Sequence, residues 1–166
     1  MCCLCRAITF YKDTTQLPDF EDYSMDGRTY RFMKEKPLFP FGHGLSYTSF
    51  KIGKAELEKN EINASASVSI TIPVSNEGEK EGVEIVQVYV HKKGLEEGPI
   101  KTLKGFKRVN LKPNETKNVT INLASNSFEF YDKKARAMKV MQGNYEIFYG
   151  NSSDPNQLKK TELKIH

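Results

Sequence analysis

Apolar and polar residues alternate along most of the chain from Tyr47 to the C-terminus. The clearest run covers residues 65–74, in which every second position is apolar: Ala66, Val68, Ile70, Ile72 and Val74. A period of two places one face of a β-strand in the core and the other face in solvent. Pro73 has no backbone N–H to contribute to a sheet. We therefore expect this strand at a sheet edge, or with a bulge near its end.

Similar runs predict further strands, separated by short turns. They cover residues 50–57, 83–90, 103–111, 119–123, 128–131, 138–141, 145–149 and 163–165. In residues 83–90, one face carries Val86, Val88 and Val90 and the opposite face carries Ile85, Gln87 and Tyr89. No amphipathic helix competes with this pattern. Seven or eight short strands with frequent turns predict an all-β protein built as a β-sandwich.

The first 46 residues have a different character. Residues 8–46 are dense in aromatic residues and contain three prolines, and only residues 8–11 have the pattern of a short strand. A segment without either period cannot build its own core. We expect it to lie along a surface and to insert its rings into something larger. The predicted divisions are therefore an atypical head at residues 1–7, a linker segment at residues 8–46 and a sandwich at residues 47–166.

Charge and composition exclude several classes of protein. The net charge is +4, but its 25 basic residues are interspersed with 21 acidic ones, whereas a nucleic-acid surface requires a basic stripe. No stretch approaches the roughly 20 apolar residues that span a bilayer, and we find no targeting signal. With 38% hydrophobic residues the chain is expected to be globular, with neither nucleic acid nor membrane as a partner.

The three cysteines all fall within the first five residues: Cys2, Cys3 and Cys5. An odd number in one cluster does not form a disulfide framework, and no paired histidines supply a fourth zinc ligand. We interpret residues 1–7 as a remnant of the gene boundary and expect no metal and no other cofactor.

Several motifs are more specific than any periodicity. Residues 27–32 (GRTYRF) and 37–48 (PLFPFGHGLSYT) closely resemble the GRTYRY and PLYPFGYGLSYT segments of family 3 β-glucosidases and β-xylosidases. Residues 82–90 (GVEIVQVYV) and 103–109 (LKGFKRV) are similar to that family's GDEVVQLYV and ELKGFKRV strands. Two closing pieces, GNYE at residues 143–146 and GNSS at residues 150–153, also resemble the family. The resemblance covers residues 8–166, with its motifs in the family's order.

The resemblance implies a fold, a parent protein and a role. It implies an immunoglobulin/fibronectin type III-like β-sandwich, detached from the C-terminal end of a retaining glycosidase that hydrolyses β-glucosides or β-xylosides. Residues 8–46 would then be the tail of that enzyme's α/β-sandwich domain and the interdomain linker. None of the family's catalytic motifs occurs here, so the chain itself is expected to have no activity. The catalytic domains of the same parent are its expected partners, and the parent is expected to be periplasmic or secreted.

Other candidate chemistry is weak in the sequence. A retaining glycosidase needs two carboxylates about 5 Å apart, but the acidic clusters at residues 19–22, 77–81 and 96–97 lie in polar loops. The Gly42-His43-Gly44 triplet precedes no helix, unlike a phosphate-binding loop. Neither Ser46 nor Ser49 has the context of a nucleophile.

Sugar binding is the alternative that the residues leave open. Aromatic residues of the linker segment could stack on sugar rings, or could pack against a neighbouring domain. The candidates for either role are Tyr23, Tyr30, Phe32, Phe39, Phe41, His43 and Tyr47. We favour packing between domains, and keep a carbohydrate-binding or cell-surface module, with polysaccharide as its partner, as the alternative.

Overall fold

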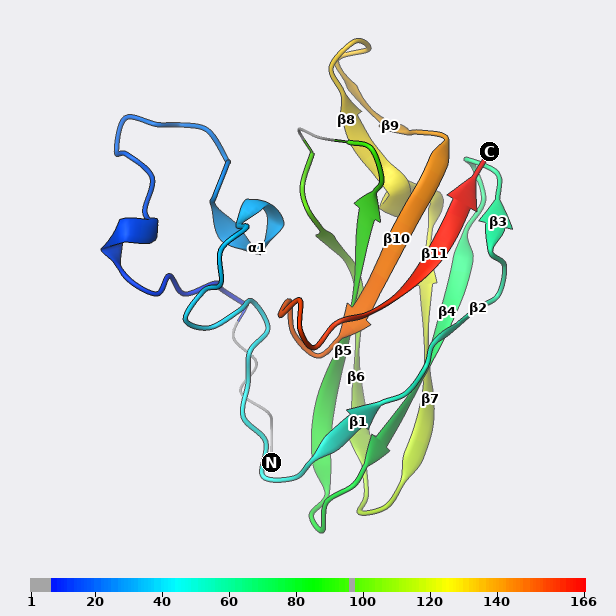
Figure 1. Ribbon diagram of the computed structural model, residues 1–166. Coiled ribbons are helices and arrows are strands. Elements are labelled where there is room, and N and C mark those ends of the chain that lie inside the picture. Colours follow the sequence, from blue (N-terminus) through cyan, green and yellow to red (C-terminus); the bar gives the residue numbers. More distant parts are fainter. Residues whose placement is uncertain (1–6, 96–97) are drawn as a thin grey trace.

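Two β-sheets pack face to face in the computed structural model, which describes residues 7–95 and 98–166 (Figure 1). All strand pairs in them are antiparallel except the parallel pair of β3 and β11. The cysteine cluster and most of the predicted head therefore lie outside the described residues. In chain order the elements are η1 (Thr14–Gln16), α1 (Thr29–Phe32), β1 (Phe50–Ile52), β2 (Glu56–Leu57), β3 (Glu61–Ile62), β4 (Val68–Asn76), β5 (Gly82–Lys92), β6 (Thr102–Leu111), β7 (Thr116–Leu123), η2 (Ser125–Phe128), β8 (Glu129–Asp132), β9 (Ala137–Val140), β10 (Gly143–Gly150) and β11 (Lys159–Ile165). The predicted β-sandwich is confirmed.

The two sheets differ in size. In the smaller sheet, β4 pairs with β1 and β2 on one side and with β7 on the other. The larger sheet has the order β3-β11-β10-β5-β6, and a separate hairpin of β8 and β9 projects beyond it (Figure 1). Most of the core lies between the sheets, where alternate residues of β4, β5, β7 and β10 are fully or almost fully buried.

Pro73 lies in an inner strand, so the expected edge position is wrong. Its carbonyl accepts a hydrogen bond from the Gly53 N–H at 2.7 Å, which shows that the carbonyl points toward the side of β4 occupied by β1 and β2. A residue's N–H and C=O point to the same side of a strand. The missing N–H therefore falls at the break between β1 and β2, where no ladder hydrogen bond is lost.

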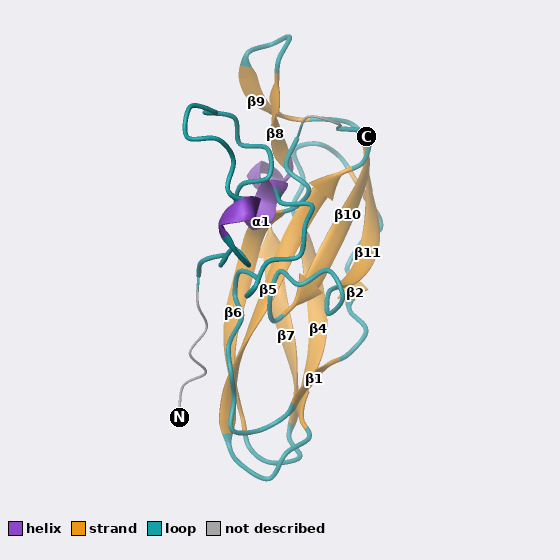
Figure 2. Ribbon diagram, turned by 60° about the vertical axis from the view of Figure 1, so that its left-hand side comes forward, coloured by secondary structure: helices purple, strands orange, loops and turns teal. Residues whose placement is uncertain are grey.

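The linker segment crosses the outer face of the larger sheet, in front of β5 and β6 (Figure 2). The strand predicted at residues 8–11 is wrong, because only an isolated bridge between Phe10 and Phe39 forms there. The short helix α1 was not predicted, since four residues are too few to carry a helical period. This segment buries the outer side of β5, where Gln87 and Tyr89 are only 3% and 0% exposed.

Candidate functional site

The contact between the linker segment and the larger sheet is centred on Tyr30. Its ring packs against Phe41 at a centroid distance of 4.5 Å and meets Tyr89 of β5 edge-on at 5.7 Å. Its hydroxyl accepts a hydrogen bond from the Leu103 N–H at 3.2 Å. Tyr30 is therefore anchored to two neighbouring strands by ring packing and by a hydrogen bond.

A tight turn holds the next part of the linker against β5. The His43 N–H donates to the Pro40 carbonyl, and Gly42 has a φ of +80°, which a type II turn requires at its third residue. A Cβ on Gly42 would lie 2.5 Å from the Gln87 Nε2. Only glycine therefore allows the linker backbone to approach β5 this closely.

Gln87 connects this turn to the loop after β10. Its Nε2 donates to the Asn151 carbonyl at 2.7 Å, and its Oε1 accepts from the Tyr89 hydroxyl at 2.5 Å. Nearby, the Ser153 N–H donates to the Phe41 carbonyl at 2.8 Å. A buried polar network with its hydrogen bonds made is costly to disturb, so it fixes where the linker sits.

Glu84 is a buried carboxylate beside the same turn. Its oxygens accept from the Ile85 N–H at 2.8 Å and from the Asn151 Nδ2 at 3.3 Å, and burial raises its pKa. It lines a pocket of about 180 Å³ that is also lined by His43, Ser46 and Thr48. This pocket is polar and small, and its position makes it part of the junction between linker and sandwich.

The rest of the linker segment, together with Tyr47 directly after it, leaves large apolar side chains in solvent. Phe20 is 94% exposed, Tyr23 91%, Leu45 80% and Tyr47 72%. Exposing large apolar side chains to water is unfavourable, and several of them on a protein surface often mark a binding surface. We call these four residues the exposed linker set.

The structure thus divides the seven predicted site residues into two groups. Tyr30, Phe32, Phe41 and His43 are partly buried, and His43 stacks on the ring of Phe39 at 4.9 Å. Phe39 is itself 41% exposed, while Tyr23 and Tyr47 point into solvent. The first group and one side of Phe39 pack within the chain, whereas Tyr23 and Tyr47 are available to another surface.

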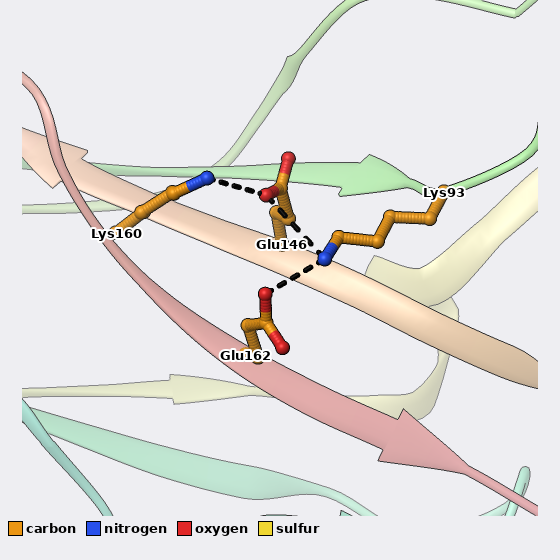
Figure 3. A network of polar contacts seen from close by, with 4 residues as sticks. All are labelled: Lys93, Glu146, Lys160 and Glu162. Atoms are coloured by element: carbon orange, nitrogen blue, oxygen red, sulfur yellow. Dashed lines mark hydrogen bonds and ion pairs between the residues drawn. The ribbon is translucent and has the colours of Figure 1, made fainter.

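A four-residue network of charges joins the end of β5 to β10 and β11 (Figure 3). Lys93 lies 2.7 Å from Glu162 and 3.7 Å from Glu146, and Lys160 lies 2.8 Å from Glu146. Burial acts to raise the pKa of Glu146, but the hydrogen bond and charge of Lys160 and the charge of Lys93 outweigh it and lower that pKa. The two lysines and the two glutamates form ion pairs with one another, so the network links the end of β5 to β10 and β11.

The remaining sequence candidates form no catalytic arrangement in the described residues. The carboxylates at residues 19–22 and 77–81 are exposed, and those at residues 96–97 lie outside the described residues. Within residues 7–95 and 98–166, no three His, Cys, Asp or Glu residues form a group that could hold a metal ion. In the same ranges, no helix has the length and apolar character needed to cross a membrane.

Comparison with known proteins identifies the fold. The family model for the fibronectin type III-like domain matches residues 84–153. The chain is therefore a protein with a fibronectin type III-like β-sandwich. Its relatives are family 3 β-xylosidases and β-glucosidases, of which it matches a short segment, as the sequence motifs predicted.

Two curated relatives and one solved structure illustrate the match. The chain is 43% identical over 159 residues to a xylan 1,4-β-xylosidase of Xylanibacter ruminicola, covering 96% of this chain and 18% of that protein. It is 38% identical over 136 residues to thermostable β-glucosidase B of Acetivibrio thermocellus, covering 80% and 18%. A β-glucosidase from Listeria innocua in complex with glucose superposes with a TM-score of 0.78 at 26% identity, covering 96% and 24%. The chain thus spans about a fifth of the length of these relatives.

Sequence reasoning missed several residues that build the junction. Glu84 and Gln87 were treated as ordinary polar positions of a strand, although a charged residue and an amide inside a run of valines can indicate burial against another segment. Nothing in the sequence indicated that Arg31 and Lys104 lie close together. They are 73 positions apart in the chain, and only the fold brings them together.

Proposed function

We propose that this chain is a non-catalytic accessory domain of a family 3 β-glycosidase, and that it supports the catalytic domains through its linker segment. The parent would hydrolyse β-xylosides or β-glucosides, as the names of the relatives indicate. In this proposal residues 8–46 form half of an interface, and residues 47–166 form the rigid body that holds it.

The exposed linker set carries the proposal. Four large apolar side chains, two before and two after the segment from Tyr30 to His43, are 72–94% exposed, while that segment is fixed to the sandwich. This combination of rings packed on the sandwich and apolar side chains left in solvent is expected when one partner of an interdomain contact is absent. Relatives about five times longer than this chain would supply the other side.

The arrangement of carboxylates supports the non-catalytic part of the proposal. Glu84 is buried, but both of its oxygens are occupied by donors of the same chain. The acidic clusters at residues 19–22 and 77–81 are exposed. Retaining hydrolysis needs a nucleophile and an acid/base about 5 Å apart beside a substrate cleft. The alternative of a carbohydrate-binding or cell-surface module has no support among the relatives, which are named as glycosidases.

One relative, a periplasmic β-glucosidase of Salmonella typhimurium, is 29% identical over 159 residues. This relative supports the proposal that the parent is periplasmic or secreted.

Two measurements test the proposal. The chain should not hydrolyse aryl β-xylosides or β-glucosides, and turnover that copurifies with it would overturn the non-catalytic part. The X. ruminicola relative lacking its matched segment should bind the separately produced chain in isothermal titration calorimetry. Absence of heat at micromolar concentrations would overturn the supporting role.

A further inference from the structure

A pocket of about 600 Å³ is lined by residues of α1 and of the β8–β9 hairpin. Its wall comes from α1, from the start of β6, from the hairpin, and from Gly94, Leu95, Gly98 and Pro99 between β5 and β6. This volume falls within the range of small-molecule sites. It is distinct from the exposed linker set, none of whose residues line it.

Arg31 and Lys104, two of the four cations in this wall, have no ionic partner in the part of the chain that the structure describes. Arg31 of α1 lies over the ring of Phe32 at 5.5 Å, but neither Arg31 nor Lys104 of β6 makes an ion pair or a side-chain hydrogen bond there. Burial and then the charge of Arg31 lower the pKa of Lys104, and Glu129 acts in the opposite direction. The two cations are therefore close enough to repel one another.

Two buried donors in the same wall also lack acceptors. The Nε of Arg31 and the hydroxyl of Thr102 are inaccessible to solvent and have no hydrogen-bond partner in the described chain. Native proteins leave few buried donors without a partner. The guanidinium, the ammonium and the hydroxyl thus all lack an acceptor in the described chain, and the two cations also lack a negative charge paired with them there.

Among the described residues, the acidic side chains of the wall leave this need unmet. Asp132 accepts hydrogen bonds from the N–H groups of Lys134 and Ala135, and so is engaged in closing the hairpin. Glu129 influences Lys104 electrostatically but forms no ion pair with it. The rest of the wall is largely apolar, including Phe32, Met138 and Met141. An apolar wall around two cations favours a ligand that has a negatively charged group and a less polar remainder.

We propose that this pocket binds a carboxylate ligand of about the size of a monosaccharide, with the carboxylate held by Arg31, Thr102 and Lys104. The planar fork of a guanidinium matches a carboxylate, and a hydroxyl and an ammonium add two further donors. The body of the ligand lies against Phe32 and the methionines. This site goes beyond the supporting role proposed above and does not depend on it.

The first test uses matched ligands. Glucuronate and glucose share a ring and differ in the carboxylate, so glucuronate should bind at least about tenfold more tightly, and more weakly as salt rises. Blocked N-acetyl-aspartate amide supplies the same group from a protein side chain. Comparable binding by it supports a carboxylate site whose natural occupant is an acidic side chain. Equal binding of glucose and glucuronate, or binding of no carboxylate up to 10 mM (roughly the upper limit of weak affinity), overturns the proposal.

The second test separates binding from folding. Lys104→Met and Thr102→Val should each weaken glucuronate binding, by about tenfold or more for the charged partner, without lowering the urea midpoint. Lys107→Met, at an exposed position of the same strand, should leave both unchanged. Arg31→Lys should retain part of the affinity for glucuronate, because lysine keeps the positive charge but lacks the planar pair of donors of the guanidinium. A Lys104→Met protein that binds glucuronate as well as the unmutated chain overturns the assignment.

A third variant tests whether the chain supplies its own carboxylate. Glu96 and Glu97 belong to the loop between β5 and β6 and lie outside the described residues. The E96Q/E97Q variant should bind glucuronate as the unmutated chain does. If glucuronate binds only to this variant, the site is internal and the proposal fails.

Discussion

Replacing Gly42 with alanine should release the linker segment from the sandwich. The change adds one methyl group at a residue whose φ is +80°. That methyl would lie 2.5 Å from Nε2 and 2.8 Å from Oε1 of Gln87, closer than real contacts allow. Gln87 would have to move, and its hydrogen bonds to Asn151 and Tyr89 would break.

The cost has two parts. A left-handed conformation costs alanine about 1–2 kcal/mol. Leaving the buried amide of Gln87 unsatisfied costs roughly a further 1–3 kcal/mol. The sum, about 2–5 kcal/mol, falls on the contact between linker and β5. Undocking of the linker avoids both parts and limits the effect on global unfolding.

Amide hydrogen exchange measures this undocking. The N–H of Ser153 donates to the Phe41 carbonyl and the N–H of Ile100 donates to the Arg31 carbonyl, so both report the docked linker. In Gly42→Ala they should exchange at least about thirtyfold faster, since about 1.4 kcal/mol corresponds to tenfold. Amides at the centre of β10, which does not contact the turn through Gly42, should keep their protection.

Gly27→Ala provides the matched control. Gly27 also has a positive φ, +69°, but a Cβ there meets nothing within 4 Å. This variant therefore has the conformational cost without the collision, and Ser153 should stay protected. Equal acceleration of Ser153 exchange in Gly27→Ala and Gly42→Ala would refute the claim that close packing on Gln87 holds the linker.

Two further substitutions test the sandwich. Tyr145→Phe removes a buried hydroxyl that donates to the carbonyls of Met141 and Phe128. Burial raises the pKa of this hydroxyl to about 12. Its loss should lower the free energy of unfolding in urea by about 1–3 kcal/mol. An unchanged midpoint would contradict this. Glu146→Gln should cost up to about 1 kcal/mol at pH 7. The folded pKa of Glu146 lies below its ordinary value of 4.5, so its contribution is present above that value and is lost as the pH falls through the folded pKa. A difference in stability from the unmutated chain that persists at pH 2 would contradict the ionic origin.

The strands could be predicted because their pattern is local. In β4 and β7 every second side chain is buried, as the alternation of residues 65–74 and 119–123 indicates. The position of Pro73 could not be predicted, since it depends on where β1 ends and β2 begins on a neighbouring strand. The region expected to hold a single strand at residues 50–57 contains both of these short strands.

The linker and the proposed pocket depend on contacts that have no period. The sequence indicated that the aromatic rings of residues 8–46 need a surface, but gave no means of telling Tyr30, which packs on Tyr89, from Tyr23, which is solvated. Arg31 and Lys104 counted only as part of a mixed charge distribution. Their proximity arises from the path of α1 across the sheet.

The most direct test of the supporting role compares variants in the association assay with the truncated X. ruminicola relative. Phe20→Ser/Tyr23→Ser removes two solvated rings and should weaken association by at least about tenfold, since burying such a ring contributes about 1.5–3 kcal/mol. Phe106→Ser removes a similarly exposed ring from β6 and should bind as the unmutated chain does. Association of the Phe20→Ser/Tyr23→Ser chain with unchanged affinity would contradict the account.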